Sequence, residues 1–242
     1  MAAGSQTEDS NAPGSILVTG GSKGIGLAIA QRFHAGGFTT IVCARDPGGL
    51  EKARSATPGL QAFQCDMTRA ADVDALAANV RELVGTPDVL VNNAGAFVPG
   101  QLHDEDESAL ERMLAANLFS AYRITRALLP GMMARGSGTI VNVCSTASIM
   151  AYPDGGSYCI AKHALHGFSR TLREEMKPHG IRVVSLLPGA TLTASWEGAD
   201  LPPERLMPAA DVAEMAWAAH AMSPRTVVEE ILMRPFLGDI GT

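Results

Sequence analysis

The sequence predicts a single doubly wound α/β domain, in which helices cover both faces of a seven-stranded parallel sheet. Short apolar runs alternate with longer segments of helical periodicity along the chain. The strand-like runs are continuously apolar, as burial on both faces of a sheet requires. A glycine-rich turn also joins the first apolar run to the first helical segment. Together these three observations favour a parallel sheet over a sandwich or a helical bundle.

The expected elements follow in order. Apolar runs predict strands at 15–20, 38–45, 61–66, 87–95, 138–145, 181–189 and 226–235. Helical periodicity predicts helices at 25–37, 70–84, 104–135, 157–178 and 211–222, and the acidic run at 103–108 is expected to begin the third. Residues 1–14 are small and polar and are expected to form a flexible tail before one domain at 15–242. Residues 191–208 interrupt the pattern just after a strand and predict a substrate loop.

Composition and charge limit the classes of function. The chain has 242 residues, 46% hydrophobic and 18% charged, which is enough for one sizeable core. Its formal net charge of −6 argues against partners such as nucleic acid or an anionic membrane, because both need a basic face. The sequence has neither an apolar run of transmembrane length nor the pattern of a secretory leader. Four cysteines without zinc-type spacing predict reduced thiols in a cytoplasmic protein.

The turn "TGGSKGIG" at 19–26 predicts a dinucleotide site of the Rossmann type. Gly20, Gly24 and Gly26 allow a tight turn, close approach of the backbone to a diphosphate, and close packing of helix on sheet. The free N–H groups at the start of the following helix would face the anion. Because the motif lies between a strand and a helix, its context supports a cofactor site rather than a structural turn.

The end of the second strand indicates which dinucleotide binds. An NAD site usually offers an acidic residue there for the ribose 2′-hydroxyl, but Ala44 stands at this place and Arg45 follows. Lys23 adds a second cation in the glycine turn, so the sequence favours NADP(H); the alternative is that Arg45 is solvated and Asp46 lies one place too late. Asp66 ends the third strand, where it could accept from the adenine amino group or cap a helix.

Tyr158 and Lys162 lie four residues apart in "SYCIAKHAL" and therefore on one helix face. A tyrosine ordinarily loses its proton near pH 10, and a neighbouring cation makes that proton easier to lose. The pair could serve as an acid–base device, or it could be an ordinary helix surface with an extended lysine. His163 and His166 on the same helix have no evident third ligand, so no metal site is expected.

Further motifs decide between these alternatives. Ser145 ends the strand at 138–145, Asn117 lies in "LAANLFS", "NNAG" ends the fourth strand at 92–95, and "PG" stands at 188–189. With the glycine turn and the Tyr158/Lys162 pair, these motifs resemble the classical short-chain dehydrogenase/reductase family in order and spacing. The resemblance covers nearly everything from residue 15 to the C-terminus.

The resemblance implies a role for each matched residue. Tyr158 would protonate the carbonyl oxygen of a substrate, Lys162 would assist it and bind the nicotinamide ribose, and Ser145 would hold the substrate oxygen. Asn117 would hold a water that links Lys162 to solvent, since its amide both donates and accepts. The implied cofactor residues are Gly20, Ser22, Lys23, Gly24, Ile25, Gly26, Arg45, Asp66, Met67, Asn93, Ala94, Gly95, Tyr158, Lys162, Pro188, Gly189, Thr191 and Thr193. Expected substrate contacts are Phe97, Met150, Tyr152 and Trp196.

The sequence therefore predicts an NADPH-dependent reductase of small carbonyl compounds. "PGATLTASW" and the C-terminal segment look like the bacterial sepiapterin-reductase-like branch, which makes a pterin side-chain ketone a candidate substrate. One alternative is a 3-oxoacyl-carrier-protein reductase, which needs a basic patch to dock its acidic carrier; Arg205 is the one cation near the substrate loop. Another is a dinucleotide-binding sensor without chemistry, which has no need of Tyr158. The resemblance also implies a homotetramer or homodimer.

Overall fold

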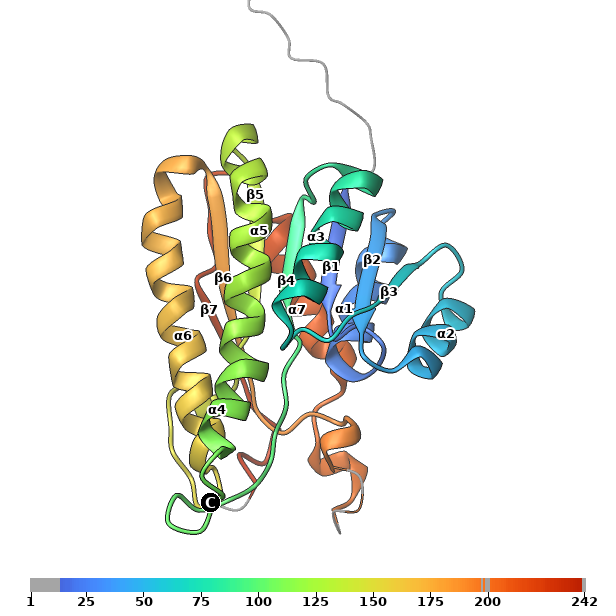
Figure 1. The fold of residues 1–242 in the computed structure, drawn as a ribbon. Coiled ribbons are helices and arrows are strands. Elements are labelled where there is room, and N and C mark those ends of the chain that lie inside the picture. The colour runs from blue at the N-terminus through green and yellow to red at the C-terminus, as the bar shows by residue number, and fades with distance from the viewer. Residues whose placement is uncertain (1–13, 197, 199–200, 241–242) are drawn as a thin grey trace, which may run out of the picture.

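The computed structural model describes residues 14–196, 198 and 201–240. Almost all of the predicted tail, and residues 197 and 199–200 of the predicted substrate loop, lie outside this part. One sheet of seven parallel strands runs through the molecule in the order β3-β2-β1-β4-β5-β6-β7 (Figure 1). The predicted fold class is confirmed. The strand order reverses between β1 and β4, where doubly wound sheets place their ligands.

The strands lie where the apolar runs predict them, and all seven are shorter than predicted. Their bounds are β1 Ser15–Thr19, β2 Thr39–Ala44, β3 Gln61–Gln64, β4 Val89–Asn92, β5 Gly138–Val143, β6 Ile181–Pro188 and β7 Glu230–Met233. The central strands β1 and β4 are buried along their whole length. The last strand is an edge strand of four residues within the predicted range 226–235.

Helices cover both faces of the sheet (Figure 1). α1 (Gly24–Ala35), α2 (Pro47–Ala56) and α7 (Ala209–Ala221) pack on one face, and α3 (Ala70–Val84), α5 (Ser120–Arg135) and α6 (Gly156–Met176) on the other. Ile16 and Val18 of β1 enter the first core, whereas Leu17 enters the second. This double burial explains the continuous apolar runs. No helix within the described residues is long and apolar enough to span a membrane.

Helix α2 is absent from the sequence prediction. Its residues "PGGLEKARSA" begin with proline and two glycines, which are typical of a loop. The structure shows Pro47 at the first helical position, where its missing N–H costs nothing. Asp46 caps the helix by accepting from the backbone N–H groups of Gly48 and Gly49 at 3.1 and 2.9 Å. The stabilisation from this cap compensates for the low helix propensity of the two glycines.

The predicted helix at 104–135 is wrong at its start and in its continuity. Turns occupy most of residues 102–108, and a short helix, α4 (Ala109–Leu114), begins after the acidic run. Asp106 in this run accepts from Ser108 and pairs with Arg112 instead of entering a helix. A π-helical segment (Ala115–Phe119) then separates α4 from α5. Local turn bonds from short acidic side chains compete with the helix here.

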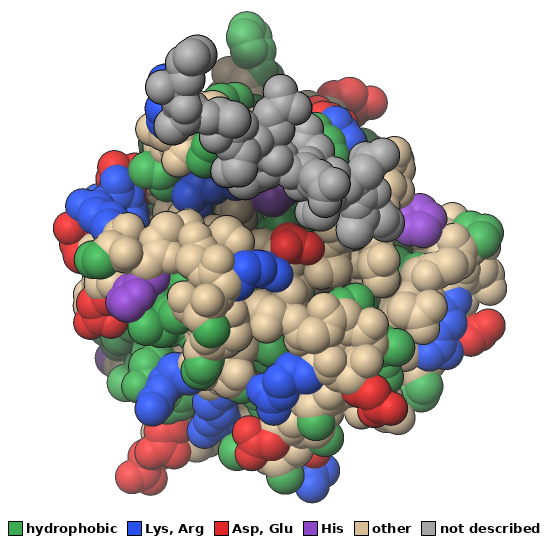
Figure 2. All heavy atoms as spheres, turned by 90° about the horizontal axis from the view of Figure 1, so that it is seen from above, with side chains coloured by type: hydrophobic (Ala, Val, Ile, Leu, Met, Phe, Trp, Pro, Cys, Tyr) green, Lys and Arg blue, Asp and Glu red, His purple; other side chains and the backbone are tan. Residues whose placement is uncertain are grey.

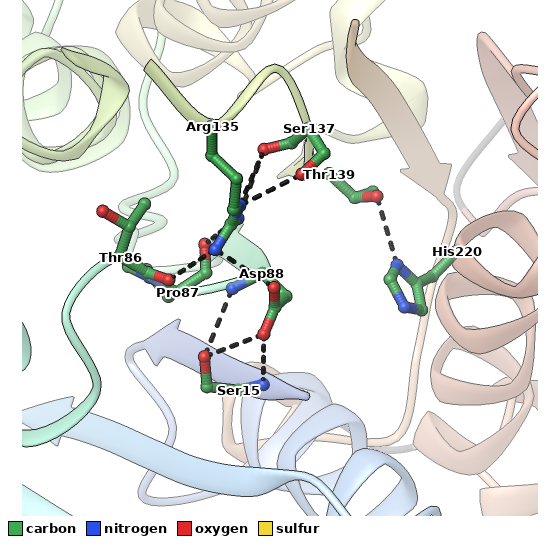
Figure 3. A network of polar contacts seen from close by, with 8 residues as sticks. All are labelled: Ser15, Thr86, Pro87, Asp88, Arg135, Ser137, Thr139 and His220. Atoms are coloured by element: carbon green, nitrogen blue, oxygen red, sulfur yellow. Dashed lines mark hydrogen bonds and ion pairs between the residues drawn. The ribbon is translucent and has the colours of Figure 1, made fainter. Parts of the chain in front are cut away.

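The amino ends of the strands lie at the top of Figure 1, away from the predicted site. On the described part of this face, positive and negative side chains are mixed and form no patch of one sign (Figure 2). Figure 3 shows that Arg135, at the end of α5, donates to the carbonyl oxygens of Thr86 and Pro87 at 2.8 and 3.0 Å. Asp88 pairs with Arg135 at 3.1 Å and accepts from the Ser15 backbone N–H at 2.7 Å. This network ties the starts of β1 and β4 to α5.

Candidate active site

The segments that carry the four predicted catalytic residues follow the carboxyl ends of the strands or begin the helices there, and this edge of the sheet lies at the bottom of Figure 1, where α4 is labelled. Asn117 lies in the π-helical segment between α4 and α5. Ser145 follows β5, and Tyr158 and Lys162 lie in the first turns of α6. Three separate segments of the chain therefore supply the predicted chemistry at the edge where a doubly wound sheet binds its ligand.

Tyr158 and Lys162 lie one turn apart on α6, as the spacing predicts. Lys162 is 6% exposed, and its Nζ donates to the carbonyl oxygen of Val143 at 3.0 Å. The same nitrogen lies 5.7 Å from the centre of the Tyr158 ring. An ammonium has three hydrogens, so two remain for a ligand or a water beside the phenol. A buried lysine held in this way is poorly explained as an ordinary helix surface.

A chain of buried hydrogen bonds fixes α6 on the sheet. Asn92 of β4 donates to Asn142 of β5 at 2.8 Å, and Asn142 donates to Ser169 of α6 at 2.9 Å. Ser169 and Ser185 of β6 share a further bond of 2.7 Å. Removing one partner would leave buried polar atoms unpaired. The chain therefore holds the helix that carries Tyr158 in one position relative to three strands.

Ser145 begins a short 3-10 segment (Thr146–Ser148) that follows β5. Its Oγ accepts from the Ala147 backbone N–H at 3.1 Å, and its own backbone N–H donates to Ser148 Oγ at 3.2 Å. A serine hydroxyl both donates and accepts. Because the Ala147 N–H uses an acceptor site, the hydroxyl hydrogen of Ser145 stays available for a substrate oxygen.

Asn117 is 1% exposed, and its side-chain amide is held by nearby backbone groups. Nδ2 donates to the carbonyl oxygens of Ala96 and Met113 at 2.9 and 3.0 Å, and Oδ1 accepts from the Ala96 N–H at 3.3 Å. Both amide hydrogens are therefore used, and a water bound by this side chain has one Oδ1 lone pair left to it. The contacts tie the π-helical segment to the chain that follows β4.

The glycine turn has the shape that a diphosphate site requires. Gly20 and Gly24 have φ values of +66° and +57°, which side chains rarely adopt. A Cβ on Gly26 would lie 2.4 Å from Asn93 Nδ2 and 2.5 Å from the Gly20 carbonyl oxygen. Glycine is therefore needed at all three positions, two for the turn and one for the close approach of strand and helix.

The amino end of α1 offers free donors at this turn. Its N-cap residue, Lys23, makes no side-chain cap, and its first turn holds no acidic residue. The N–H groups at the start of a helix need an acceptor, which an anion can supply. Thr193, from the loop after β6, lies across the turn with its Cγ2 3.2 Å from the Cβ position of Gly24. These residues fit the diphosphate of a dinucleotide.

The "NNAG" segment joins β4 to the glycine turn. Asn93 Nδ2 donates to the carbonyl oxygens of Thr19 and Gly20, both at 3.0 Å. The Ala94 N–H donates to Thr19 Oγ1 at 3.0 Å. A Cβ on Gly95 would lie 2.6 Å from Asn117 Oδ1. Asn93 thus supports the turn through its side chain, and Gly95 leaves room for the side chain of Asn117.

The end of β2 carries no free carboxylate at the predicted ribose position. β2 ends at Ala44, and the exposed Arg45 follows. Gln64 Nε2 donates to the Arg45 carbonyl oxygen at 3.1 Å and so holds its backbone. Both carboxylate oxygens of Asp46 cap α2. Asp46, the acid that follows Arg45, is therefore already bound to the first N–H groups of α2.

A cavity of about 540 Å³ opens beside this position, and Arg45, Asp66 and Arg69 contribute to its lining. The Thr68 backbone N–H, which donates to Asp66 Oδ1 at 3.0 Å, holds the pKa of that carboxyl below its usual value. Asp66 therefore caps the turn before α3, and its role toward adenine stays a prediction. Met67 is buried, with its sulfur against Cys43 and Cys65.

Pro188 is the last residue of β6, and Gly189 begins the loop that follows it. The Gly189 N–H donates to the Met233 carbonyl oxygen at 2.8 Å. Thr191 is buried, and its hydroxyl donates to the Gly189 carbonyl oxygen at 2.9 Å. Of the two predicted threonines, Thr193 lies against the glycine turn, whereas the hydroxyl of Thr191 stabilises its own loop.

The predicted substrate contacts occupy different places around the site. The Phe97 ring packs edge-on against Tyr158, with centroids 4.9 Å apart. Burial, and secondarily the neighbouring Tyr158, raises the pKa of Tyr152 above its usual value, so its phenol stays neutral at physiological pH. Met150 Sδ lies 3.7 Å from Nη2 of Arg234, near the C-terminal segment. Trp196 is half-buried in a short 3-10 segment of the substrate loop.

The two histidines of α6 have protein partners. His163 Nδ1 lies 2.9 Å from the Cys159 carbonyl oxygen, and His166 Nε2 lies 3.0 Å from Glu230 Oε1. Within the part of the chain that the structure describes, no group of three or more His, Cys, Asp or Glu side chains is arranged to hold a metal.

Sequence reasoning missed two residues at this edge of the sheet. Arg69 joins Arg45 in lining the cavity, and its place three residues after Asp66 is the signal that could have found it. Glu105 bonds to Ser157, the residue before Tyr158. These two residues lie 52 positions apart, so no local pattern in the sequence indicates that contact.

A family model described as short chain dehydrogenase matches residues 15–201. The chain belongs to this family of oxidoreductases. A 2-(S)-hydroxypropyl-CoM dehydrogenase of Xanthobacter autotrophicus is 36% identical over 190 residues, which cover 77% of this chain and 74% of that protein. A sepiapterin reductase of Chlorobaculum tepidum is 33% identical over 237 residues, covering 93% of this chain and 97% of the relative.

Solved structures give the same result. An alcohol dehydrogenase from the archaeon Thermococcus sibiricus, complexed with 5-hydroxy-NADP, superposes with a TM-score of 0.87 at 27% identity. The match covers 96% of this chain and 100% of that one. The resemblance stated from the motifs is therefore confirmed for the family and the fold.

Proposed function

We propose that residues 15–242 form one catalytic domain that uses NADPH to reduce the carbonyl group of a small molecule to an alcohol. The observation that carries the proposal is the placement of Tyr158 beside the buried Lys162, at the sheet edge that also holds the glycine turn. When bound, the dinucleotide supplies the hydride from its nicotinamide ring. Every other requirement falls on side chains of this chain.

The reaction needs a proton at the carbonyl oxygen as the hydride arrives. The Tyr158 hydroxyl donates that proton, and the free hydroxyl hydrogen of Ser145 binds the same oxygen and orients it. Lys162 keeps two ammonium hydrogens for the ribose hydroxyls and for a water that returns the proton to Tyr158. Asn117 joins the π-helical segment (Ala115–Phe119) to the chain that follows β4 through its bonds to Ala96. In the reverse direction Tyr158 acts as the base.

NADP(H) is favoured over NAD(H) because of the charges at the adenosine end. Lys23 and Arg45 are exposed cations there, and Arg69 adds a third at the cavity. Asp46, the acid that directly follows Arg45, uses both oxygens to cap α2, and Asp66 and Asp72, which also line the cavity, bond to Thr68 and to Arg69. Arginine and lysine complement a 2′-phosphate. The Thermococcus relative, whose structure holds 5-hydroxy-NADP, supports the same choice.

For the substrate, we propose a small ketone or diketone, with a pterin side-chain ketone as the first candidate. The match to the sepiapterin reductase covers 93% of this chain and therefore runs through the substrate loop at 191–208. A 3-oxoacyl-carrier-protein reductase is disfavoured, because Arg205 bonds to the carbonyl oxygens of Gly238 and Asp239 and so turns toward this chain's own C-terminal segment.

We also propose a homo-oligomer in a reducing compartment such as the cytoplasm. Exposed apolar side chains lie on α6 and the adjoining helices, among them Phe119, Tyr122 and Ile160, and such side chains mark association surfaces when they gather. All four cysteines are buried free thiols, as is usual in reducing compartments.

The direct test measures NADPH oxidation with a panel of ketones, diketones, pterins and acyl thioesters. Tyr158→Phe should lower turnover by roughly a hundredfold or more, because general acid catalysis is lost. NADPH binding, followed by fluorescence, should persist, because the glycine turn is intact. Ser145→Ala should also slow turnover. Full activity of Tyr158→Phe would contradict the mechanism, and a wild-type protein inert toward the whole panel would contradict the function.

A further inference from the structure

The start of α6 lacks a cap of its own. Its N-cap residue is Gly155, which has no side chain, and the first turn holds no acidic residue. The backbone just before it is strained at Asp154, whose φ of +61° is the one positive value among non-glycine residues of the described chain, and Gly156, the first residue of α6, has a φ of +26°. A helix start of this kind needs acceptors from elsewhere. Tyr158 lies in this same first turn.

Glu105 supplies those acceptors from the loop that follows β4. Its Oε1 accepts from the Ser157 backbone N–H at 2.9 Å, and its Oε2 accepts from the Ser157 hydroxyl. Ser157 is 1% exposed, so both of its donors would otherwise be buried without a partner. A carboxylate at this place also complements the helix dipole. Glu105 thus does from 52 residues away what a capping box does locally.

The chain is shaped around this contact. A Cβ on Gly156 would lie 2.1 Å from Glu105 Oε1, and a Cβ on Gly100 would lie 2.7 Å from Glu105 Cγ. The Gly100 N–H donates to the Asp154 carbonyl oxygen at 2.9 Å, and Gln101 Nε2 donates to Asp154 Oδ1 at 2.8 Å. The loop after β4 is therefore joined to the segment before Tyr158 by backbone and side-chain bonds together.

The same loop also reaches the ring of Tyr158. Phe97, at its beginning, packs edge-on against that ring with centroids 4.9 Å apart, and Glu105 holds the backbone one residue before it. One continuous segment thus contacts the tyrosine at its ring and beside its backbone. An orientation fixed at both places leaves the phenol little freedom to turn away from a substrate oxygen.

We propose that Glu105 is a positioning residue, which acts through Ser157 to fix the start of α6 and so aims the Tyr158 hydroxyl at the substrate. The claim that Glu105 affects turnover rests on the proposed function. The claim that Glu105 fixes the start of α6 rests on the structure alone. Removing the anchor should lower kcat much more than it raises the KM for NADPH, because Tyr158 lies next to the anchored Ser157, whereas Lys162 is held separately by the Val143 carbonyl oxygen and no hydrogen bond in the described chain joins the glycine turn to Glu105.

The test compares Glu105→Ala, Glu105→Gln and the matched control Glu107→Ala, an exposed glutamate of the same acidic run. Glu105→Ala should lower kcat roughly tenfold or more, as expected for a misplaced catalytic group. Glu105→Gln should restore most of it, since the amide oxygen accepts from the Ser157 N–H and the amide NH₂ donates to its hydroxyl. Glu107→Ala should match the wild type. Unfolding by urea separates these effects from loss of the fold.

Hydrogen exchange at residues 155–160 gives a readout that needs no substrate. Glu105→Ala should raise exchange there, and Glu107→Ala should not. Unchanged exchange in Glu105→Ala overturns the anchor, whatever the activity of the wild type. Raised exchange with unchanged kcat overturns the positioning role, as does a Glu105→Gln variant no better than Glu105→Ala. If the wild type reduces no carbonyl compound, the proposed function and the positioning role fail together, and exchange alone decides the anchor.

Discussion

At the scale of single residues, Arg45 is the side chain on which we propose that cofactor choice depends. It is exposed at the end of β2, its backbone is held by Gln64, and it lines a cavity with Arg69. A planar guanidinium suits bidentate contact with phosphate. A phosphate contact made by Arg45 would distinguish NADPH from NADH, because the two differ at the 2′ position alone.

Arg45→Ala should raise the KM for NADPH roughly tenfold, the loss expected for one charge-assisted hydrogen bond, and leave the KM for NADH nearly unchanged. Arg69→Ala should act in the same direction. Steady-state kinetics with both cofactors measures this, and Arg225→Ala, at another exposed arginine, serves as the control. An equal loss for NADPH and NADH would show that Arg45 does not read the 2′-phosphate.

The sequence predicts single residues well where their relation is local. Tyr158 and Lys162 share a helix face because four residues separate them, and Gly20, Gly24 and Gly26 form one turn. Contacts such as Glu105 with Ser157 depend on where two loops meet in space. No spacing in the sequence encodes that meeting, so the structure was needed to find it.

At the scale of elements, α2 depends on its cap. Asp46→Ala removes both acceptors from the Gly48 and Gly49 N–H groups, and should lower the free energy of unfolding by about 1 kcal/mol. Asp46→Asn should retain most of that stability. Urea denaturation measures both. Asp74→Ala, an exposed aspartate on α3, is the control, and an Asp46→Ala variant as stable as this control would show that the cap contributes nothing.

Element prediction succeeds where periodicity is uninterrupted. Residues 70–84 form α3 with the predicted bounds, because nothing in this stretch breaks the helical pattern. The π-helical segment at Ala115–Phe119 adds one residue to a turn and contains neither glycine nor proline, so no helix breaker in the sequence reveals it. Helix α2 was missed for the opposite reason, since its first residues are poor helix formers that only a cap makes tolerable.

At the scale of the whole molecule, stability should depend on pH through His220. Burial, with a smaller effect of Arg182 and against an opposing effect of Asp88, lowers the pKa of His220 from 6.5 to about 4. The unfolded chain therefore takes up a proton at a pH where the folded chain does not. The neutral, partly buried His220 therefore contributes to the free energy of unfolding. This contribution is complete above the pKa of the unfolded chain and is lost as the pH falls toward the pKa of the folded chain.

His220→Gln should remove that part of the pH dependence. Between about pH 7.5 and about pH 5, the wild type should lose roughly 1–2 kcal/mol more unfolding free energy than the variant, with an allowance for solvent screening of a partly exposed ring. Urea denaturation at both pH values gives the difference. His103→Gln, at an exposed histidine, should behave as the wild type; identical pH slopes for wild type and His220→Gln would refute the assignment.

The doubly wound sheet could be predicted because it follows from one physical requirement, the burial of its strands on both faces. A sheet buried on both faces needs continuous apolar strands, and β1 and β4 meet that requirement along their whole length. The short edge strand β7 was predicted too long, because the apolar Val227 and Val228 lie just before the residues that pair with β6. Hydrophobicity thus predicts burial, whereas the length of a strand depends on its neighbour.

The commitment of Asp46 to α2 limits how this protein could evolve toward another cofactor. A carboxylate that holds a helix end cannot be reassigned to a ribose without loosening that helix. A lineage that merely lost Arg45 would give up affinity for one dinucleotide and gain none for the other. The accessible route is a new acid at position 44, where β2 ends. Exchange of cofactors then requires two substitutions, the gain of this acid and the loss of Arg45. The order in which they occur decides whether the singly substituted protein still binds a dinucleotide.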